Sequence, residues 1–368
     1  MRLDRLALHN FRSYAEAACA FDGSCNILVG ENAQGKTNLL ESIVLLAAGE
    51  SPRTRSDREM IRFGESAAFL TGEALSRDRR FRMELTLQAG QKKKLSVNGV
   101  AQRRVHDAGE VLSCVYFCPD DLQLIRAGAE RRRRFLDEAL TQLLPRYGEA
   151  LRIYRRCYEQ KASILRNLDE RPSDVVLLPE FSEGMAEYGA VLIHYRARYI
   201  AALSHAAAEM HADCSGGREA LSLTYETVSS VTDPLAPPKT IYAALREHQQ
   251  SHEKAELSAR QCLSGPHKDD LAIGINGENA RVYGSQGQAR TAALALKLAE
   301  RELLREAKEE YPLLLLDDVL SELDPRRQDF VLNRIQGGQV FISCCEEDRL
   351  GALVQGRVFR IRGGNIEE

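Results

Sequence analysis

One run of residues fits the phosphate-binding pattern GxxxxGK[ST]: Gly30, Glu31, Asn32, Ala33, Gln34, Gly35, Lys36 and Thr37. The stretch Asn26-Ile27-Leu28-Val29 before it predicts a short buried strand, and the apolar spacing after Asn38 predicts a helix. Backbone N–H groups and the helix start would bind phosphates, Lys36 would reach the terminal ones, and the Thr37 hydroxyl would bind Mg²⁺. The pattern therefore predicts a polyphosphate site, and a chance match in a glycine turn is the alternative.

Two adjacent carboxylates follow a second apolar run late in the chain. The leucines at 313–316 predict a buried strand that ends at Asp317 and Asp318. In a phosphate-loop fold, the Mg²⁺ aspartate stands at the carboxyl end of a central strand. We therefore predict two catalytic residues: Asp317, which would bind Mg²⁺ with Thr37, and Asp318, which would orient the attacking water or accept its proton. The alternative is a core strand that runs out into a polar loop.

A serine–glycine segment offers a second anion site. Ser285, Gly287 and Gln288 stand just before a helix that the apolar spacing predicts from about 289 to about 307. The N–H groups at a helix start bind anions. Since one chain needs only one γ-phosphate site, this second site predicts contact with another nucleotide. A further polar segment, Ser321-Glu322-Leu323-Asp324, follows the two carboxylates.

The composition is that of a protein with a sizeable core and a charged surface. Of the 368 residues, 44% are hydrophobic and 28% are charged, and this length suits about two domains. No apolar run approaches the roughly 18 residues of a membrane span, and the chain starts without a secretory segment, so we expect a cytoplasmic protein. Nine cysteines without a CxxC pair favour reduced thiols over a zinc site. The net charge of −3 restricts nucleic-acid binding to a local patch.

The pattern of predicted elements changes twice along the chain. Strands are predicted first, at 3–8, 25–29, 68–74, 81–87, 94–97 and 114–117. Charged helical patterns then cover 122–168 and 180–213, a loop-rich stretch covers 214–238, and a strand is expected at 271–275. We therefore predict an α/β domain formed by residues 1–120 and 265–368. A mainly helical domain, 121–264, would interrupt it.

Two stretches are locally basic although the whole chain is not. The first contains the candidate DNA-binding residues Arg79, Lys92, Lys93, Lys94, Arg103 and Arg104. Such clusters contact phosphates without base specificity, and the Asn98-Gly99 pair among them predicts a hairpin turn. The second covers residues 126–166 and includes the arginine run 131–134, for which DNA contact and ion pairing with nearby acids are both open. His267, with no second His or Cys nearby, is expected to be a hydrogen-bonding loop residue and not a metal ligand.

Taken in order, these motifs resemble the ABC-type ATPase heads of chromosome and repair proteins, and more closely the RecF family of bacterial recombination mediators. The resemblance extends over nearly the whole chain, including the size of the insertion. Its segments are Leu8-His9-Asn10-Phe11-Arg12-Ser13-Tyr14, Gly35-Lys36-Thr37-Asn38-Leu39-Leu40-Glu41, Gly265-Pro266-His267-Lys268-Asp269-Asp270, and Ser285-Gln286-Gly287-Gln288 with the helix after it. Cys344 and Cys345 occupy the place where ABC heads often have a switch histidine.

The resemblance implies an α/β, phosphate-loop head of the Rad50/SMC type with a compact helical second lobe. It also implies two ATP molecules with Mg²⁺, each held between two copies of the chain. Ser285 of one copy would contact the γ-phosphate bound by Lys36 of the other, with Gly287 and Gln288 beside it. Arg12 would contact phosphate from the end of the first strand.

The function implied by the resemblance is a nucleotide-gated dimeric clamp on DNA, with Asp324 at the dimer interface. A weak Mg²⁺-dependent ATPase, stimulated by DNA, would switch the clamp between gripping and releasing. The implied partners are gapped, duplex or single-stranded DNA, a second copy of the chain, and the proteins RecR and RecO. The implied roles are recombinational repair at the nucleoid, replication of damaged DNA, the SOS response and help in loading recombinase at gaps.

Two other classes of protein share parts of this pattern. The ATPase subunit of a membrane transporter has the phosphate loop and the signature segment, but it has a shorter insertion and a groove for a membrane helix. A small-molecule kinase has the loop, but it needs a closed acceptor pocket and lacks a signature segment. The size of the insertion argues against the first class, and Ser285 to Gln288 argue against the second.

Overall fold

The computed structural model describes residues 1–345 and 356–367 and divides the chain into two compact units. Unit 1 contains Met1–Gln123 and Ala293–Glu368, and unit 2 contains Leu124–Ala292. Along the chain, the first boundary between the units lies close to the expected one, 120/121, but the second lies well beyond the expected one, 264/265. Residues 265–292 lie in unit 2 because the strand Asp270–Ile275 pairs with Leu221–Glu226 of the same unit.

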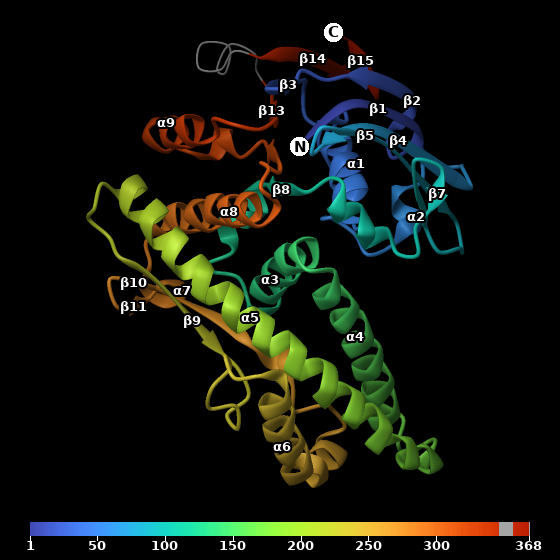
Figure 1. Ribbon diagram of the computed structural model, residues 1–368, viewed down its shortest axis with the longest axis vertical. Coiled ribbons are helices and arrows are strands. Elements are labelled where there is room, and N and C mark those ends of the chain that lie inside the picture. The colour runs from blue at the N-terminus through green and yellow to red at the C-terminus, as the bar shows by residue number, and fades with distance from the viewer. Residues whose placement is uncertain (346–355, 368) are drawn as a thin grey trace. The chain divides into compact units, whose positions relative to one another are not determined.

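Unit 1 begins with an antiparallel sheet of six strands in the order β2-β1-β4-β5-β6-β7. These strands, shown in Figure 1, are β1 (Arg2–Phe11), β2 (Tyr14–Ala20), β4 (Ala67–Ser76), β5 (Arg79–Gln88), β6 (Lys94–Val97) and β7 (Val100–Ala101). Burial alternates along β4, so that one face of the sheet is packed and the other faces water. Asn98 and Gly99 have φ angles of 51° and 78°, which confirms the predicted hairpin turn between β6 and β7.

A second, mainly parallel sheet contains β3, the strand that precedes the phosphate loop. It has the order β15-β14-β3-β13-β12-β8, in which β15 pairs antiparallel with β14 and the other pairs are parallel. Its strands are β3 (Cys25–Val29), β8 (Cys114–Phe117), β12 (Leu313–Asp317), β13 (Val340–Cys344), β14 (Arg357–Arg362) and β15 (Asn365–Glu367). The strands β3, β12 and β13 are buried at every position, as strands covered on both faces are.

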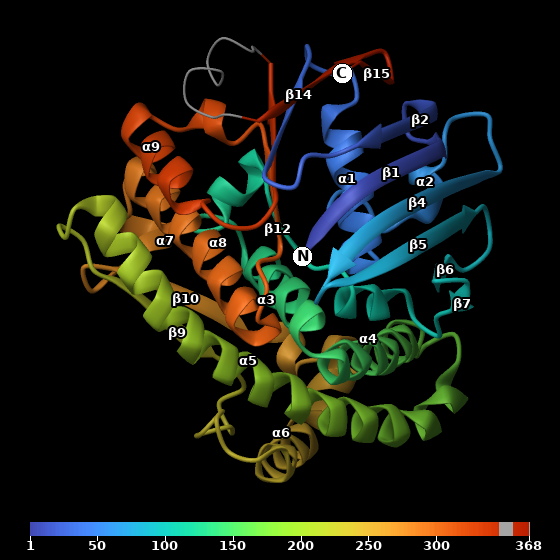
Figure 2. The same cartoon turned by 45° about the horizontal axis from the view of Figure 1, so that its top comes forward.

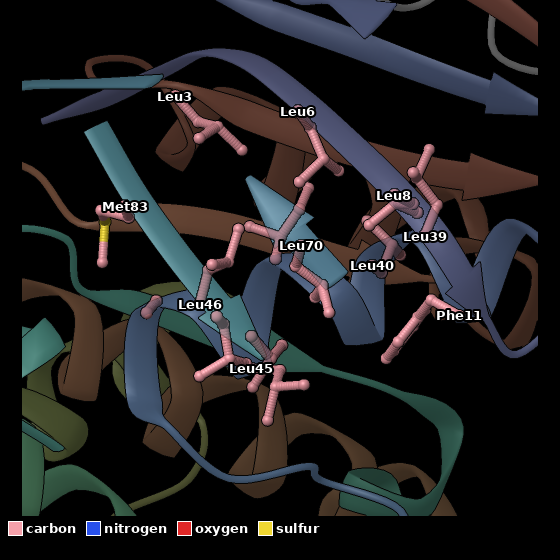
Figure 3. Packing of buried hydrophobic residues seen from close by; sticks show 14 of the residues in the cluster. Leu3, Leu6, Leu8, Phe11, Leu39, Leu40, Leu45, Leu46, Leu70 and Met83 are labelled. Carbon is pink, nitrogen blue, oxygen red and sulfur yellow. The ribbon is translucent and has the colours of Figure 1, made fainter. Parts of the chain in front are cut away.

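Helix α1 (Lys36–Ala48) packs against both sheets of unit 1. Its residues are buried from Leu39 to Ala47, and all of them except Glu41 and Ser42 are apolar, as suits a helix inside a protein. Apolar side chains of α1 and of the two sheets form one cluster. Figure 3 labels Leu3, Leu6, Leu8, Phe11, Leu39, Leu40, Leu45, Leu46, Leu70 and Met83 of this cluster, and Leu313, Leu315 and Phe341 of the parallel sheet also belong to it.

The other elements of unit 1 are short or lie in the later part of the chain. They are α2 (Asp57–Met60), α9 (Pro325–Arg334) and the 3₁₀ helices η1 (Val105–Glu110), η2 (Pro119–Gln123) and η5 (Leu320–Glu322). Helix α8 (Gln286–Lys308) contains the second boundary between the units. Within the described ranges, no helix is long and apolar enough to cross a membrane.

Unit 2 is mainly helical. Its helices are α3 (Ala129–Leu143), α4 (Pro145–Arg166), α5 (Leu178–Ser215), α6 (Pro238–Ala259) and α7 (Ala280–Tyr283), with the 3₁₀ helices η3 (Pro172–Leu177) and η4 (Pro266–Lys268). A small sheet has the order β11-β10-β9, with β9 (Leu221–Glu226), β10 (Asp270–Ile275) and β11 (Glu278–Asn279). The long helix α5 packs against α4, α6 and β9 (Figure 1).

The strands predicted before residue 118 are all present. The strands β2 and β9, one in each unit, are not predicted. β2 is rich in alanine, which has weak strand preference. The loop-rich prediction for 214–238 is wrong at β9, because Gly216-Gly217 before the strand and the prolines at 234, 237 and 238 after it dominate the pattern. β9 is fixed by pairing with β10, which comes much later in the chain.

A buried ionic network centred on Arg196 of α5 joins several elements of unit 2. The Arg196 guanidinium lies 2.8 Å from Asp137 of α3 and 3.0 Å from Asp269, and it donates to the carbonyl of Pro266 at 2.8 Å. The hydroxyl of Tyr225 in β9 also donates to Asp269. Burial raises the pKa of the Asp269 carboxyl, and the Arg196 guanidinium opposes this rise. Arg196 therefore compensates two carboxylates that water does not reach.

The arginine run 131–134 takes part in the internal structure of unit 2. Arg132 forms a two-pronged ion pair with Asp270, with both distances 2.7 Å. Arg133 donates to the Asp269 carbonyl at 2.6 Å, and Arg134 pairs with Glu138 one helical turn away. Of the two alternatives for this run, the structure supports pairing within the protein for these three residues.

His267 forms hydrogen bonds, as predicted, but it lies in the short 3₁₀ helix η4 and not in a loop. Its Nδ1 lies 2.6 Å from the Tyr154 hydroxyl, and its Nε2 lies 3.3 Å from the Cys262 carbonyl. The ring also packs against Tyr158, with centroids 4.5 Å apart. Burial lowers the pKa of His267 to about 4, so the imidazole is neutral at pH 7.

We expect Arg196→Met to lower the free energy of unfolding by about 3–5 kcal/mol, because two buried carboxylates lose their cation. The folded protein would then raise the pKa of Asp269 further above its unfolded value, so stability would fall as pH rises through that range. Urea titrations should therefore show a larger loss at pH 7 than at pH 5.

Arg152→Met is the matched control, because the Arg152 side chain, paired with Glu149 on α4, is 57% exposed. Exposed pairs contribute about 1 kcal/mol or less. Equal losses in the two variants would contradict the importance of the Arg196 network.

Candidate functional site

The phosphate loop leaves β3 after Val29 and enters α1 at Lys36. Gly35 has a φ of 124°, which favours glycine. A Cβ atom there would lie 2.9 Å from the Tyr14 hydroxyl, which donates to the Gly35 carbonyl at 3.0 Å. A Cβ atom on Gly30 would clash with the carbonyl of Ile361 in β14. The two glycines therefore let the loop pass close to β2 and β14.

The turn between β14 and β15 also holds the loop. The Gly363 N–H donates to Oε1 of Gln34 at 2.6 Å, and the Gly364 N–H donates to the Gln34 carbonyl at 3.1 Å. Among the predicted nucleotide ligands, Gln34 thus uses its side chain to fix the loop.

Lys36 is a nearly buried cation at the start of α1, with 6% of its surface exposed. Its ammonium donates to the carbonyls of Gly30 and Glu31, the latter at 2.9 Å, and lies 3.8 Å from Sγ of Cys345. The Cys345 thiol in turn donates to the Asn32 side chain at 3.1 Å. No carboxylate in the described part of the chain pairs with Lys36. Its positive charge is therefore available to an anion.

Thr37 and Asp317 meet at the start of α1, although 280 positions separate them in sequence. The Thr37 hydroxyl lies 3.1 Å from Oδ1 of Asp317, to which Ser343 also donates at 2.8 Å. The Tyr116 hydroxyl donates to Oδ2 at 2.7 Å. Burial and the Asp317 carboxylate both raise the pKa of Tyr116, so this hydroxyl remains a donor. The two oxygen ligands predicted for Mg²⁺ therefore stand together.

Asp318 follows with a positive φ of 53°, an uncommon conformation outside glycine. Its N–H donates to Oγ of Ser343 in β13 at 2.8 Å, and its carboxylate accepts from Ser321 at 3.1 Å. Such a conformation persists where neighbouring groups hold it. These contacts fix the direction of the Asp318 side chain.

A cleft of about 220 Å³ joins these groups within unit 1. The lining residues come from the phosphate loop, from α1, from the loop after α1 and from the end of β12: Asn32, Ala33, Gly35, Lys36, Thr37, Asn38, Arg53, Asp317 and Asp318. The cleft therefore brings together most of the predicted loop ligands and both predicted catalytic aspartates. Gly30, Glu31 and Gln34 belong to the loop without lining the cleft.

The nucleotide ligands predicted from the sequence do not include two of the lining residues, Asn38 and Arg53. Arg53 donates to Oδ1 of Asn38 at 2.9 Å and lies 3.4 Å from Glu41. Asn38 could be found from its place on the first turn of α1. A single arginine in a polar loop has no pattern that distinguishes it, so Arg53 becomes visible only in the fold.

Arg12, the predicted phosphate contact from the first strand, is bound elsewhere in the structure. Its guanidinium pairs with buried Glu41 at 2.7 and 2.9 Å and donates to the Glu59 carbonyl at 2.6 Å. Arg12 does not line the cleft. It connects α1 to α2.

Ser285 and Gln288 form a reciprocal cap at the start of α8. Oγ of Ser285 accepts from the Gln288 N–H at 3.1 Å, and Oε1 of Gln288 accepts from the Ser285 N–H at 2.9 Å. Gly287 accepts from the Thr291 hydroxyl at 3.0 Å. Ser285 is exposed and belongs to unit 2. Because the cap uses Ser285 as an acceptor, its hydroxyl proton can still bind an anion.

The predicted DNA-binding residues lie at two ends of the antiparallel sheet. Arg79 begins β5 beside the turn from β4. The others follow the far end of β5 or lie next to β6 and β7: Lys92, Lys93, Lys94, Arg103 and Arg104. Lys93 pairs with Asp57 of α2 at 3.3 Å. The structure thus groups five of the residues and separates Arg79 from them.

Known proteins resemble this chain over its whole length. Residues 2–355 match the RecF/RecN/SMC N terminal domain family. The DNA replication and repair protein RecF of Bacillus subtilis (strain 168) is 37% identical over 370 residues, which covers 100% of both chains. The solved structure of the recombination mediator protein RecF-ATP in the RecFOR pathway has a TM-score of 0.90 and 33% identity, and the match covers 99% of this chain and 96% of that chain.

A more distant neighbour shows the fold. The Smc head domain of Pyrococcus furiosus, with an extended coiled coil and bound to the C-terminal domain of ScpA, has a TM-score of 0.55 at 16% identity, and the match covers 99% of this chain and 95% of that chain. The predicted fold class, an α/β phosphate-loop head of the SMC type with a helical second lobe, is confirmed by these matches. The chain belongs to the RecF family of DNA replication and repair proteins.

Proposed function

We propose that the chain is an ATP-dependent DNA-binding protein, two copies of which form a nucleotide-gated clamp in recombinational DNA repair. The observation that carries the proposal is the cleft that unites the phosphate loop with Asp317 and Asp318. The similarity of the chain to the recombination mediator protein RecF-ATP in the RecFOR pathway supports ATP as the nucleotide and recombinational repair as the pathway. The relatives compared above are repair and chromosome proteins, so the transporter alternative is without support.

ATP with Mg²⁺ fits the chemistry of the cleft. The helix start and the Lys36 ammonium suit phosphate oxygens, and Arg53 adds a second cation to the wall. Mg²⁺ takes oxygen ligands and is usually held by one or two carboxylates together with phosphates and water. Thr37 and Asp317 would supply the protein ligands. Bound Mg²⁺ would neutralise charge that develops on the phosphates during hydrolysis.

Asp318 is the residue that we assign to the attacking water. It lines the cleft directly after the metal-site carboxylate, and contacts with Ser343 and Ser321 hold it. A carboxylate in this place can orient water or accept its proton. We infer a weak ATPase, stimulated by DNA, that serves as a switch.

A second copy of the chain would complete each nucleotide site. Ser285, with Gly287 and Gln288, presents a hydroxyl group at the start of α8. It would contact the γ-phosphate held by Lys36 of the other copy. Asp324, which caps α9, would line the interface. ATP that contacts both copies binds the dimer better than the monomer and so shifts the equilibrium toward the dimer.

The dimer would grip gapped, duplex or single-stranded DNA at the nucleoid in the cytoplasm, and hydrolysis would release it. The cations beside β6, including Lys92 and Lys94, supply phosphate contacts. RecR and RecO would be its partners in loading recombinase at gaps. The roles that follow are recombinational repair, replication of damaged DNA and the SOS response.

Lys36→Ala should raise the dissociation constant for ATP by about 10- to 100-fold, because a charge-assisted contact to phosphate is lost. Titration calorimetry with ATP and Mg²⁺ measures this effect. Lys239→Ala, which removes an exposed lysine of unit 2, should bind ATP as the wild type does. Equal affinities in the two variants would exclude Lys36 as a phosphate ligand.

Ser285→Arg should bind ATP normally but fail to dimerise with ATP, because the larger side chain would occupy the interface. Light scattering with and without ATP measures the dimer. Ser173→Arg places the same side chain on an exposed serine of the same unit and should still dimerise. An ATP-induced dimer of Ser285→Arg would show that the site is not shared in this way.

Asp318→Asn should bind ATP and DNA but hydrolyse ATP at least about 100-fold more slowly, because the group that accepts the proton is lost. Its dimer on DNA should consequently persist longer after free ATP is removed. Asp78→Asn, at an exposed turn, should hydrolyse ATP at the wild-type rate. A wild-type hydrolysis rate in Asp318→Asn would remove this residue from the mechanism.

A further inference from the structure

The exposed face of the antiparallel sheet in unit 1 carries a pair of rings. Strand register places His9 of β1 directly opposite Phe69 of β4, and the ring centroids lie 6.0 Å apart. Paired side chains share one face of a sheet, and the adjacent residues Leu8 and Leu70 are buried on the other face. Phe69 is 46% exposed, and β1 and β4 are inner strands of the sheet (Figure 2). The two rings therefore face solvent on neighbouring inner strands.

The same row across the sheet ends in a lysine. Phe69 pairs with Thr86 of β5, and Thr86 pairs with Lys94 of β6. His9, Phe69, Thr86 and Lys94 thus stand in one line across β1, β4, β5 and β6. Lys92 is exposed just before β6. Neither lysine pairs with a carboxylate of the residues that the structure describes.

The neighbouring row has small side chains on β2, β1 and β4. Ala7 of β1 pairs with Thr71 of β4 and with Ala18 of β2. Because these side chains are short, they leave open the space beside His9 and Phe69, and a flat group can lie against the rings. Two glutamates flank the rings on this face: Glu16 of β2 is opposite His9, and Glu84 of β5 is opposite Thr71. Glu84 pairs with Arg82 at 2.9 Å, so its charge is already compensated.

A third ring extends from the same end of the sheet. Ile61 forms a bridge to Phe11 at the end of β1, and Phe63 follows in the segment that leads into β4. Phe63 is fully exposed. The ion pair between Lys93 and Asp57 connects the chain before β6 to α2, which directly precedes this segment. Rings and lysines therefore gather at one end of one sheet.

We propose that this face binds single-stranded nucleic acid, with bases stacked on Phe69 and His9 and phosphates bound by Lys92 and Lys94. Unpaired bases stack on Phe, Tyr, Trp and His, and some RNA-binding domains present such rings on a four-stranded sheet. A duplex offers no free base faces to the rings. An apolar protein partner would use Phe69 but would not need Lys92 and Lys94. The inference rests on the proposed DNA-binding function and assigns it a form of DNA and a place.

The test is fluorescence anisotropy of the full-length chain with labelled oligothymidine of about 15 nucleotides and with a duplex of similar length, with and without ATP. The double variant Phe69→Ala and His9→Ala should bind oligothymidine about 10-fold more weakly and the duplex as before. Phe69→Tyr should keep the affinity, whereas Phe69→Leu, which keeps apolar surface but lacks a ring, should lose it. Val100→Ala removes apolar surface that is 65% exposed on β7 of the same sheet and should have no effect.

The lysines have a separate readout in the salt dependence. The double variant Lys92→Ala and Lys94→Ala should reduce the slope of log K against log salt by about 1.4, because each phosphate contact to a single strand contributes about 0.7. An unchanged slope would exclude these lysines as phosphate contacts and overturn that half of the proposal.

Several outcomes separate this inference from the clamp. Wild-type oligothymidine affinity in the Phe69→Ala and His9→Ala double variant, or in Phe69→Leu, overturns the stacking surface. A wild type that binds only duplex with ATP overturns the inference and leaves the clamp standing. A wild type that binds no DNA under any condition overturns both.

Discussion

The burial of α1 on all its sides is the constraint on which the nucleotide cleft depends. The helix begins at Lys36 and packs against both sheets of unit 1, so each sheet fixes the position of the helix start. The N–H groups of that start can bind phosphate only where the helix places them. Glu41, wholly buried in the same helix, requires compensation, and Arg12 and Arg53 provide it. The fold thus uses Arg12 to hold α1.

Both units contain buried ion pairs, but in unit 2 these pairs join several elements. In unit 1 a large apolar cluster surrounds α1, and the polar groups of the cleft lie at its edge. Unit 2 contains buried ion pairs in addition to its apolar contacts, among them Lys161 with Glu256 and Arg196 with Asp137 and Asp269. Buried ion pairs add little net stability, but each demands a particular arrangement of its partners. The segment Gly265–Asp270, which the resemblance singles out, therefore has a structural role through Asp269 and Asp270.

Sequence reasoning succeeds here where the signal is local. The phosphate loop, the buried strands around it and the turn at Asn98 each depend on a few neighbouring residues, and each is present in the fold. It misses β9, because pairing with β10 decides that strand, and it misses Arg53, because only the fold brings that side chain to the cleft. The second domain boundary is misplaced for the same reason, because β10 looks like part of the α/β domain until its pairing with β9 is known. The adjacency of Thr37 and Asp317 was predictable only through a known fold, because 280 positions separate them.

The contact between Gln34 and Gly363 has a consequence for the order in which the chain is made. These residues are 329 positions apart, so the phosphate loop is synthesised long before the turn that holds it. At about 5–20 residues per second, this interval is roughly 15 to 65 seconds. The strands β12, β13 and β14 also emerge only in the last part of this interval. Until then α1 can cover only the side that faces the antiparallel sheet, and its other apolar side stays exposed in the nascent chain. The same burial that positions the helix therefore makes the unfinished protein dependent on protection from aggregation while unit 2 is being translated.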